Sequence, residues 1–201
     1  MKKQIVVIHG GETFETYEEY LAFLSEYVLD FDQTQQTFWK DTFAEKLGND
    51  YEVIFPRMPN ALNAKYFEWK IWFEKYLPHL RDGVVLVGHS LGGIFLAKYL
   101  SENTFPKEIL GTFLIAAPHD AEGAPYSLAD FVLPDSLALI EKQGGEIYLF
   151  QSKDDPVVQY EDVLKYQKDI PSATLVIFED RQHFTQIELP ELIQKIHKLE
   201  E

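Results

Sequence analysis

Ser90 is the residue whose surroundings most clearly predict chemistry. It lies in the pattern Gly88-x-Ser90-x-Gly92, which is the spacing of a nucleophile elbow. A serine hydroxyl attacks a carbonyl carbon only when its oxygen stands clear of the backbone and beside a base. A tight turn meets the first requirement, and the two glycines omit side chains that would clash inside the turn. We therefore expect Ser90 to be a nucleophile.

The residues on either side of this pattern predict the strand-turn-helix context that an elbow requires. Residues 84–87 are consecutive apolar residues, as is typical of a strand buried on both faces. Apolar residues then recur with helical spacing over residues 91–100. Ser90 would then lie at a helix N-terminus, where free amides and the helix dipole favour developing negative charge.

Loops that follow other predicted strands can supply a base and an acid. Apolar runs alternate with helical segments along the chain, which predicts a parallel sheet covered on both faces. These runs are residues 4–8, 51–55, 111–117, 146–150 and 174–178. The carboxyl ends of parallel strands meet at one edge of a sheet. We expect the residues that follow these strands to meet there, namely His9-Gly10-Gly11, Ser90, Asp154, Asp155 and His183.

Two further segments can lie near this edge. Apolar and aromatic residues recur with helical spacing from Glu12 to about Phe31, which predicts an amphipathic helix. Packing against the core is the preferred interpretation of its aromatic stripe, and a helical flap formed by residues 12–33 is the alternative. Residues 118–145 are broken by prolines and a glycine, and we expect them to form a small cap. Other helices are predicted over about 34–47, 63–79, 160–169 and 188–199.

The motifs together resemble a known family. Gly88-His89-Ser90-Leu91-Gly92-Gly93, then Asp155-Pro156-Val157-Val158, then His183-Phe184 are similar to the α/β-hydrolase superfamily. Within it, the chain most resembles the small serine hydrolases of the retinoblastoma-binding-protein type and their bacterial relatives. The resemblance covers nearly the whole chain. It implies one α/β-hydrolase domain over residues 1–201, with about six mostly parallel strands, helices on both faces and a small or absent lid.

The resemblance also implies roles for particular residues. Ser90 is the nucleophile, His183 is the general base and then the acid, and Asp155 fixes the imidazole. The backbone amides of Gly11 and Leu91 form the oxyanion hole. The sequence departs from the family at Gln182, where a glycine often precedes the histidine, and at Gln159, where proline is frequent. The first departure leaves the path of the His183 loop open.

Three aspartates compete for the role of the acid. Asp155 precedes Pro156, which restricts its backbone to extended conformations and so fixes it most rigidly. Asp154 is expected to be a solvated turn residue. Asp120 follows the fourth strand, where some hydrolases of this fold place the acid, and with His119 it forms an alternative acid–base pair. Of the other histidines, His89 is expected to point away from the nucleophile, whereas His9 either lines the pocket or is structural.

Composition excludes several classes of function. The net charge of −15 disfavours nucleic acid and anionic lipid, and no apolar run approaches the length of a membrane span. The sequence contains no cysteine, which fits the cytoplasm. It has no metal-binding spacing, P-loop or GxGxxG motif. We therefore expect no metal, no cofactor and no nucleic-acid or membrane partner.

These observations predict a serine hydrolase that cleaves small carboxylic esters through an acyl-enzyme. The overall charge favours neutral or cationic esters over anionic ones. A thioesterase, an amidase or an acyltransferase with the same triad is the closest alternative. A hydrolase-fold binding or regulatory protein with little turnover is an alternative from another class. The substrate, the oligomeric state and any protein partner are left open.

Overall fold

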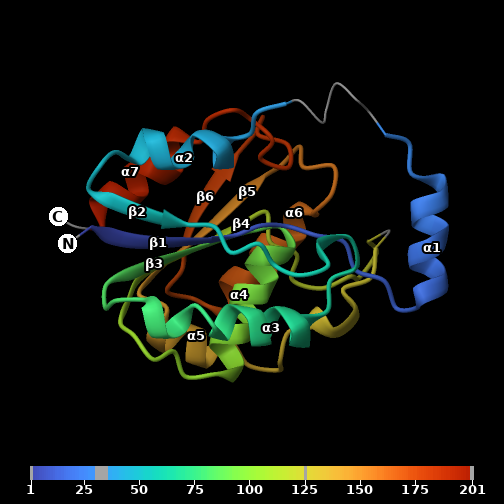
Figure 1. Cartoon of the computed structure of the whole chain (residues 1–201), viewed down its shortest axis with the longest axis horizontal. Helices are drawn as coiled ribbons and strands as arrows, with labels where there is room; N and C mark the ends of the chain where they lie inside the picture. Colours follow the sequence, from blue (N-terminus) through green and yellow to red (C-terminus); the bar gives the residue numbers. More distant parts are fainter. Residues whose placement is uncertain (1, 30–35, 125, 200–201) are drawn as a thin grey trace.

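The structure, a computed structural model, describes residues 2–29, 36–124 and 126–199. In this part of the chain six parallel strands form one sheet in the order β2-β1-β3-β4-β5-β6, as the sequence predicts (Figure 1). The strands are β1 (Lys3–Ile8), β2 (Tyr51–Ile54), β3 (Val84–His89), β4 (Ile109–Ile115), β5 (Glu146–Ser152) and β6 (Thr174–Phe178).

Helices cover both faces of this sheet (Figure 1). On one face lie α2 (Trp39–Leu47) and α7 (Pro190–Lys198). On the other face lie α3 (Tyr66–Glu74), α4 (Leu91–Glu102), α5 (Ala138–Gln143) and α6 (Tyr160–Asp169). Strand β1 illustrates why both faces are apolar. Ile5 and Val7 pack on the side of α2 and α7, whereas Val6 and Ile8 pack on the side of α3 to α6. The two pairs differ because successive side chains of a strand point to opposite faces of the sheet.

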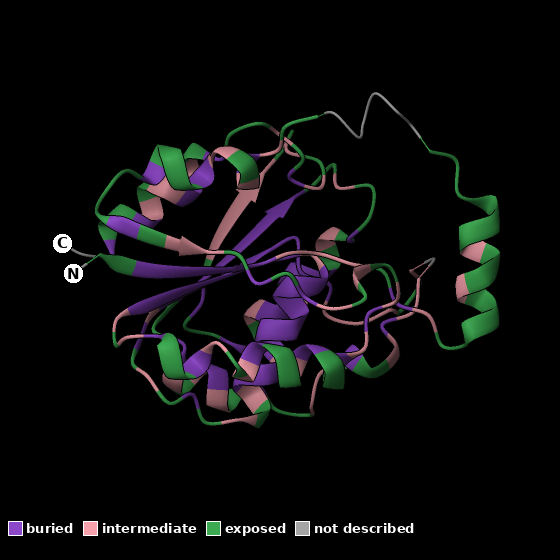
Figure 2. Ribbon diagram, viewed as in Figure 1, coloured by how far each residue is buried: buried purple, intermediate pink, exposed green. Residues whose placement is uncertain are grey.

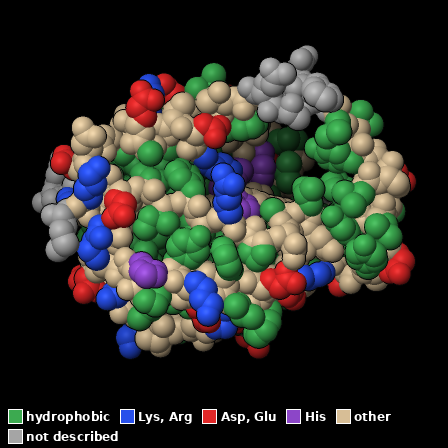
Figure 3. Space-filling model, viewed as in Figure 1, with side chains coloured by type: hydrophobic (Ala, Val, Ile, Leu, Met, Phe, Trp, Pro, Cys, Tyr) green, Lys and Arg blue, Asp and Glu red, His purple; other side chains and the backbone are tan. Residues whose placement is uncertain are grey.

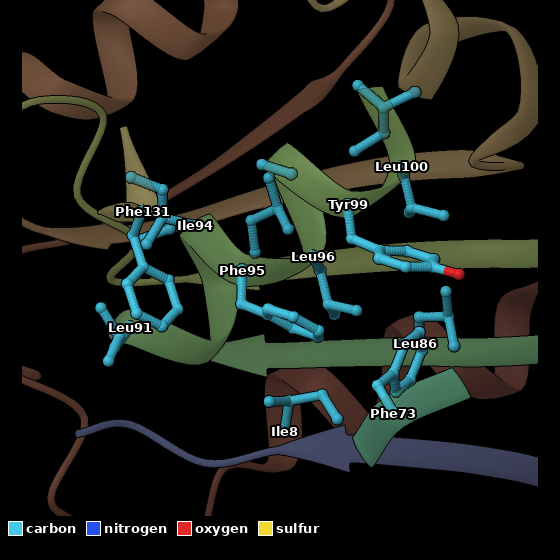
Figure 4. Close-up of a cluster of buried hydrophobic side chains, with 14 of the residues drawn as sticks. Ile8, Phe73, Leu86, Leu91, Ile94, Phe95, Leu96, Tyr99, Leu100 and Phe131 are labelled. Carbon is cyan, nitrogen blue, oxygen red and sulfur yellow. The ribbon is translucent and has the colours of Figure 1, made fainter. Parts of the chain in front are cut away.

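Helix α4 is the most deeply buried helix of the fold (Figure 2). Phe95 has no exposed surface and makes edge contacts with Trp69 and Phe73 of α3. The close-up shows Phe95 on α4 between Phe131 on one side and Phe73 on the other (Figure 4). Burying a side chain of this size contributes about 1.5–3 kcal/mol, so this packing fixes the direction in which α4 leaves the elbow.

The strand order places a crevice beside this helix. The chain leaves β1 toward β2 and leaves β3 toward β4, on opposite sides, so the order of the strands reverses between β1 and β3. Connections that diverge in this way leave an opening at the carboxyl ends of the two strands. The loops that begin at His9 and at Ser90 flank that opening.

The N-terminal helix α1 (Tyr17–Glu26) differs from the preferred expectation. Thr16 is its N-cap. The Thr16 side chain accepts a hydrogen bond from the Glu19 amide, and the Glu19 carboxylate accepts one from the Thr16 amide. None of its residues is buried, and it lies apart from the layers of the fold (Figure 1). The interpretation of its aromatic stripe as core packing is therefore wrong. Its rings pack mainly on one another and on Phe14. Phe31 and residues 30–33 of the alternative flap lie outside the described residues.

The segment 118–145 contributes both to the core and to the rim of the crevice. Phe131, at the end of the 3-10 turn η4 (Ala129–Phe131), and Ile140 of α5 are fully buried. Nearer the crevice, the Thr13 hydroxyl donates to the backbone carbonyl of Ser127. This hydrogen bond joins the loop after β1 to the segment expected to act as a cap.

Candidate active site

Ser90 occupies the sharp turn between β3 and α4. Its backbone angles are φ 56° and ψ −125°, which a non-glycine residue rarely adopts. Its amide donates to the Ile115 carbonyl at 2.8 Å. A Cβ at Gly88 would lie 2.4 Å from the Gly92 carbonyl oxygen, and one at Gly92 would lie 2.4 Å from the Ile8 oxygen. The glycines are thus required by the close approach of β1, β3 and α4, and the conformation matches the elbow predicted from the spacing.

Ser90 borders a cavity of about 390 Å³ at the carboxyl edge of the sheet. The surface is hollowed at this place, with histidine side chains in its wall (Figure 3). The walls come from the loop after β1, the start of α2, the elbow, residues 118, 126–128 and 157–158, and His183. A cavity of this volume accommodates a small organic molecule.

His183 and Asp155 meet beside this cavity. The His183 Nδ1 atom lies 2.9 Å from Asp155 Oδ2 and 3.1 Å from Oδ1. The Asp155 side chain is fully buried, and its Oδ1 atom accepts from the Val157 and Val158 amides at 2.8 and 3.0 Å. Because its partners are donors, the carboxylate acts as an acceptor and the hydrogen of the pair lies on Nδ1. His183 therefore keeps Nε2 free for another partner.

Asp154 makes different contacts. Asp154 is exposed, as expected. Its Oδ1 atom nevertheless accepts hydrogen bonds from Gln182 N at 2.8 Å and from Ser152 Oγ at 2.5 Å. The Ser152 hydroxyl is the largest cause that lowers the pKa of the Asp154 carboxyl. Gln182 has a φ of 46°, in the left-handed region that favours glycine. Gln182 therefore adopts the backbone conformation in which the family often has glycine. The hydrogen bond from its amide to Asp154 stabilises this strained conformation.

Asp120 and His119 lie away from the cavity. His119 Nε2 is 2.8 Å from Asp169 Oδ2, and Asp120 pairs with Lys165 at 2.7 Å. Neither Asp120 nor His119 lines the cavity of Ser90. The two residues belong to an ion-pair cluster around α6 and do not reach Ser90 as an alternative acid–base pair.

The loop after β1 brings backbone amides to the nucleophile. A Cβ built at Gly10 would lie 3.6 Å from Ser90 Oγ, and one at Gly11 would lie 2.6 Å from the Ala61 oxygen. Gly11 and Leu91 both line the cavity. Within the described ranges neither of their amides donates to a protein acceptor. Both amides are available to an oxygen atom bound in the cavity.

Two other histidines have structural contacts at the wall. His9 lines the cavity, and its Nε2 atom accepts from Met58 N at 2.9 Å while Nδ1 lies 2.6 Å from the Gly10 carbonyl. His89 also lines the cavity and packs against the His183 ring at 4.9 Å. The expectation that the His89 side chain points away from Ser90 stays a prediction. The ring turns toward His183 because its Nε2 atom contacts the His183 backbone carbonyl at 2.9 Å.

Sequence reasoning missed several residues of this cavity. Lys40 enters it from the first turn of α2, and Glu12, Tyr126 and Ser127 line it. Burial is the largest cause that raises the pKa of Glu12, and burial lowers the pKa of Lys40 to about 8. No motif marks these residues, because they reach the cavity from two separate loops and a helix start. The sequence predicts a helix over about 34–47, whereas α2 begins at Trp39, so the sequence did not show that Lys40 stands at a helix start.

Comparisons with known proteins show the family of the chain and its fold. A family model described as serine hydrolase matches residues 28–187, and the chain belongs to the serine hydrolase family. The ydeN gene product from B. subtilis has 18% sequence identity and a TM-score of 0.70, with 98% of each chain covered. Est1E from Butyrivibrio proteoclasticus has 14% identity and a TM-score of 0.58, with 98% of this chain and 86% of that chain covered.

The Pyrococcus furiosus esterase Pf2001 has 17% identity and a TM-score of 0.58, with 98% of this chain and 82% of that chain covered. At these identities the structural neighbours define the fold alone, which is the α/β-hydrolase fold expected from the sequence. No curated protein gives a significant sequence match.

Among the described residues, no helix combines the length and the apolar character needed to cross a membrane. In the same ranges, no cluster of three or more His, Cys, Asp or Glu side chains is arranged to hold a metal ion.

Proposed function

We propose that this serine hydrolase cleaves small carboxylic esters through an acyl-enzyme on Ser90. The observation that carries the proposal is the placement of Ser90, on a strained elbow, and of the hydrogen-bonded His183–Asp155 pair around one cavity of about 390 Å³. Esterases among the structural neighbours support the ester class.

The proposed reaction follows from the roles available to these groups. His183 Nε2 takes the Ser90 hydroxyl proton as Oγ attacks the ester carbonyl carbon, and Asp155 stabilises the resulting imidazolium. The oxyanion accepts hydrogen bonds from the Gly11 and Leu91 amides, each worth about a hundredfold to a thousandfold in rate. His183 then protonates the leaving alcohol. Water, activated by the same histidine, releases the acid from Ser90.

A fluorophosphonate probe tests the nucleophile directly. We expect the native protein to be labelled once, at Ser90, and to hydrolyse 4-nitrophenyl butyrate. Ser90→Ala should fold normally, by circular dichroism, and should be neither labelled nor active. Labelling of Ser90→Ala at the native rate would contradict the proposal.

The alternatives on the same residues differ in the bond cleaved or the acceptor. A thioesterase, an amidase or an acyltransferase would require the same Ser90, so product analysis with matched ester, thioester and amide substrates separates them. A binding or regulatory protein would show labelling without turnover of any of these. The absence of cysteine favours a cytoplasmic location, and we propose no cofactor, nucleic-acid or membrane partner.

A further inference from the structure

Lys40 places a positive charge in the cavity without an acidic partner. Its Nζ atom lies 3.1 Å from His89 Nδ1, and Lys40 lines the same cavity as Ser90 and His183. In the described part of the chain it makes no ion pair. Lys46, on the same helix, is the ordinary case, because it is exposed and pairs with Glu188 at 2.5 Å.

His89 does not neutralise this charge. Its Nε2 atom faces the His183 carbonyl oxygen, which can only accept, so Nε2 carries the hydrogen. In the neutral ring Nδ1 is then an acceptor, and the Lys40 ammonium group donates to it. Burial, followed by the charges of Lys40 and His183, holds the pKa of His89 well below its usual range. The ring is therefore neutral and does not offset the charge of the protonated Lys40.

The position of Lys40 is unfavourable for a cation in two ways. It is half-buried, and it lies in the first turn of α2, where the helix dipole repels positive charge. The acidic groups near it form no ion pair with it in the part of the chain that the structure describes. Glu12 lines the same cavity, but burial raises the pKa of its carboxyl and so favours the neutral form. Asp41 follows Lys40 on α2, but the Asp41 carboxylate accepts from the Phe38 amide at 2.8 Å. His9, in the loop after β1, and His89, at the end of β3, face Lys40 and add no negative charge. An uncompensated charge in a cleft is typical of a binding group.

We propose that Lys40 selects esters that carry a carboxylate, which its Nζ atom binds inside the cavity. This inference rests on the proposed function, since it names the substrate class of the same site. The ammonium group has two further hydrogens besides the one donated to His89, so it can bind a carboxylate without losing that contact. A charge-assisted hydrogen bond of this kind corresponds to about tenfold to a hundredfold in affinity.

The net charge of −15 predicts a preference against anionic esters. The distance over which each interaction acts decides whether this repulsion or the attraction to Lys40 prevails. At 0.15 M salt the Debye length is about 8 Å, which screens most of the distant acidic side chains. A hydrogen bond inside the cavity acts at about 3 Å and is screened much less. The local charge of Lys40 should therefore outweigh the overall charge once the ester is bound.

Matched ester pairs test this at 0.15 M salt. On the acyl side, 4-nitrophenyl hydrogen glutarate is compared with 4-nitrophenyl pentanoate. On the alcohol side, 4-acetoxybenzoate is compared with 4-acetoxybenzamide. We expect the wild type to prefer the anionic member of at least one pair, as kcat/KM, and the pair concerned shows which end of the ester meets Lys40. Lys40→Met should lower kcat/KM for that anionic ester about tenfold or more and change the neutral ester less than about threefold.

Lys46→Met is the matched control and should leave the preference unchanged. Equal losses on both esters in Lys40→Met would overturn the inference, because Lys40 would then act only by positioning His89 and the His183 loop. No preference in either wild-type pair would also overturn it. Failure of the wild type to hydrolyse the neutral esters in a Ser90-dependent manner would instead contradict the proposed function.

A pH series and a binding measurement separate recognition from folding effects. Because Lys40 has a pKa of about 8, the preference for the anionic ester should fall between pH 7 and pH 9. In Lys40→Arg the preference should persist to pH 9, since arginine keeps its charge. By calorimetry, Ser90→Ala should bind the anionic ester at least tenfold more tightly than Ser90→Ala/Lys40→Met does. Equal affinities would contradict the inference without any turnover being needed.

Discussion

At the scale of single residues, two adjacent aspartates follow the same strand but make different contacts. The Asp155 side chain is fully buried against His183 and two backbone amides. The exposed Asp154 instead accepts hydrogen bonds from the Gln182 amide and from the hydroxyl of the buried Ser152. The fixed direction of the Asp155 side chain gives His183 one tautomer and one orientation. Asp154 acts on the path of the loop that carries His183.

These contacts predict unequal effects of removing each negative charge. Asp155→Asn should lower kcat for a small ester at least a few hundredfold, because an amide facing Nδ1 favours the wrong tautomer, as in the well-studied protease triad. Asp154→Asn should cost less than about tenfold, since the amide oxygen can still accept from Gln182 N. Steady-state kinetics of the two variants measure this difference.

Asp120→Asn serves as the control, because Asp120 lies in the cluster around α6 and should leave kcat within about threefold. A reversed ranking of Asp154 and Asp155, or a collapse only in Asp120→Asn, would overturn the assignment of the acid. Ser90 and His183 would keep their proposed roles in either case.

At the scale of elements, α1 and α4 are both rich in apolar residues but differ in what they stabilise. In α4 nine residues are buried, and in α1 none is. The helical spacing of apolar residues is similar in both segments, so the pattern alone does not distinguish a core helix from an exposed one. The difference lies in what packs beside each helix: α4 lies against α3 and the strands, whereas α1 lies apart from the layers of the fold (Figure 1).

Helix α1 should therefore contribute little to the free energy of unfolding. Leu21 and Leu24 are 46% and 41% exposed, so Leu21→Ser and Leu24→Ser should each change it by less than about 0.5 kcal/mol. Phe95→Ala, in α4, should lower it by about 3–5 kcal/mol. Urea unfolding of the three variants measures these changes in the free energy of unfolding.

A loss above about 2 kcal/mol in either leucine variant would mean that α1 packs against another surface in solution. The same variants bear on the flap formed by residues 12–33. If these residues cover the cavity, kcat/KM for 4-nitrophenyl butyrate should change in the leucine variants, although the stability does not.

At the scale of the whole molecule, one buried acid links stability to pH. Asp162 is 4% exposed, and burial is the largest cause that raises its pKa from 3.8 to about 6. Between these two values the folded protein binds more protons than the unfolded chain does. The contribution of Asp162 to the free energy of unfolding should therefore fall as pH rises from about 4 to 6, and remain lower above that range.

Asp162→Asn removes this dependence. The variant should be more stable than the wild type by about 1–3 kcal/mol at pH 7.5, and the difference should vanish near pH 4. Urea unfolding at several pH values measures it, with the exposed Asp130→Asn as the control. A variant that is less stable than the wild type at pH 7.5 would mean that the pair with Lys165 outweighs the cost of burial.

The sequence by itself determined the strands of the sheet and the strained turn at Ser90. The apolar runs of β1 to β6 and the glycines of the elbow are local features, because strand burial and a tight turn leave their marks within a few residues. Right-handed connections then bring the strand ends to one edge, which is why the loops of His9, Ser90, Asp155 and His183 could be expected to meet. Organisation as one domain over residues 1–201 stays a prediction.

The tertiary structure alone decided which side chains fill the space between those loops. Lys40 reaches the cavity from a helix start, and Tyr126 and Ser127 reach it from the segment after β4. The direction of His89 depends on the His183 carbonyl, 94 residues away in sequence. Contacts of this kind depend on the relative placement of whole elements, which no local pattern encodes. The exposure of α1 has the same origin, since a helical period states which side chains share a face and not whether anything packs against it.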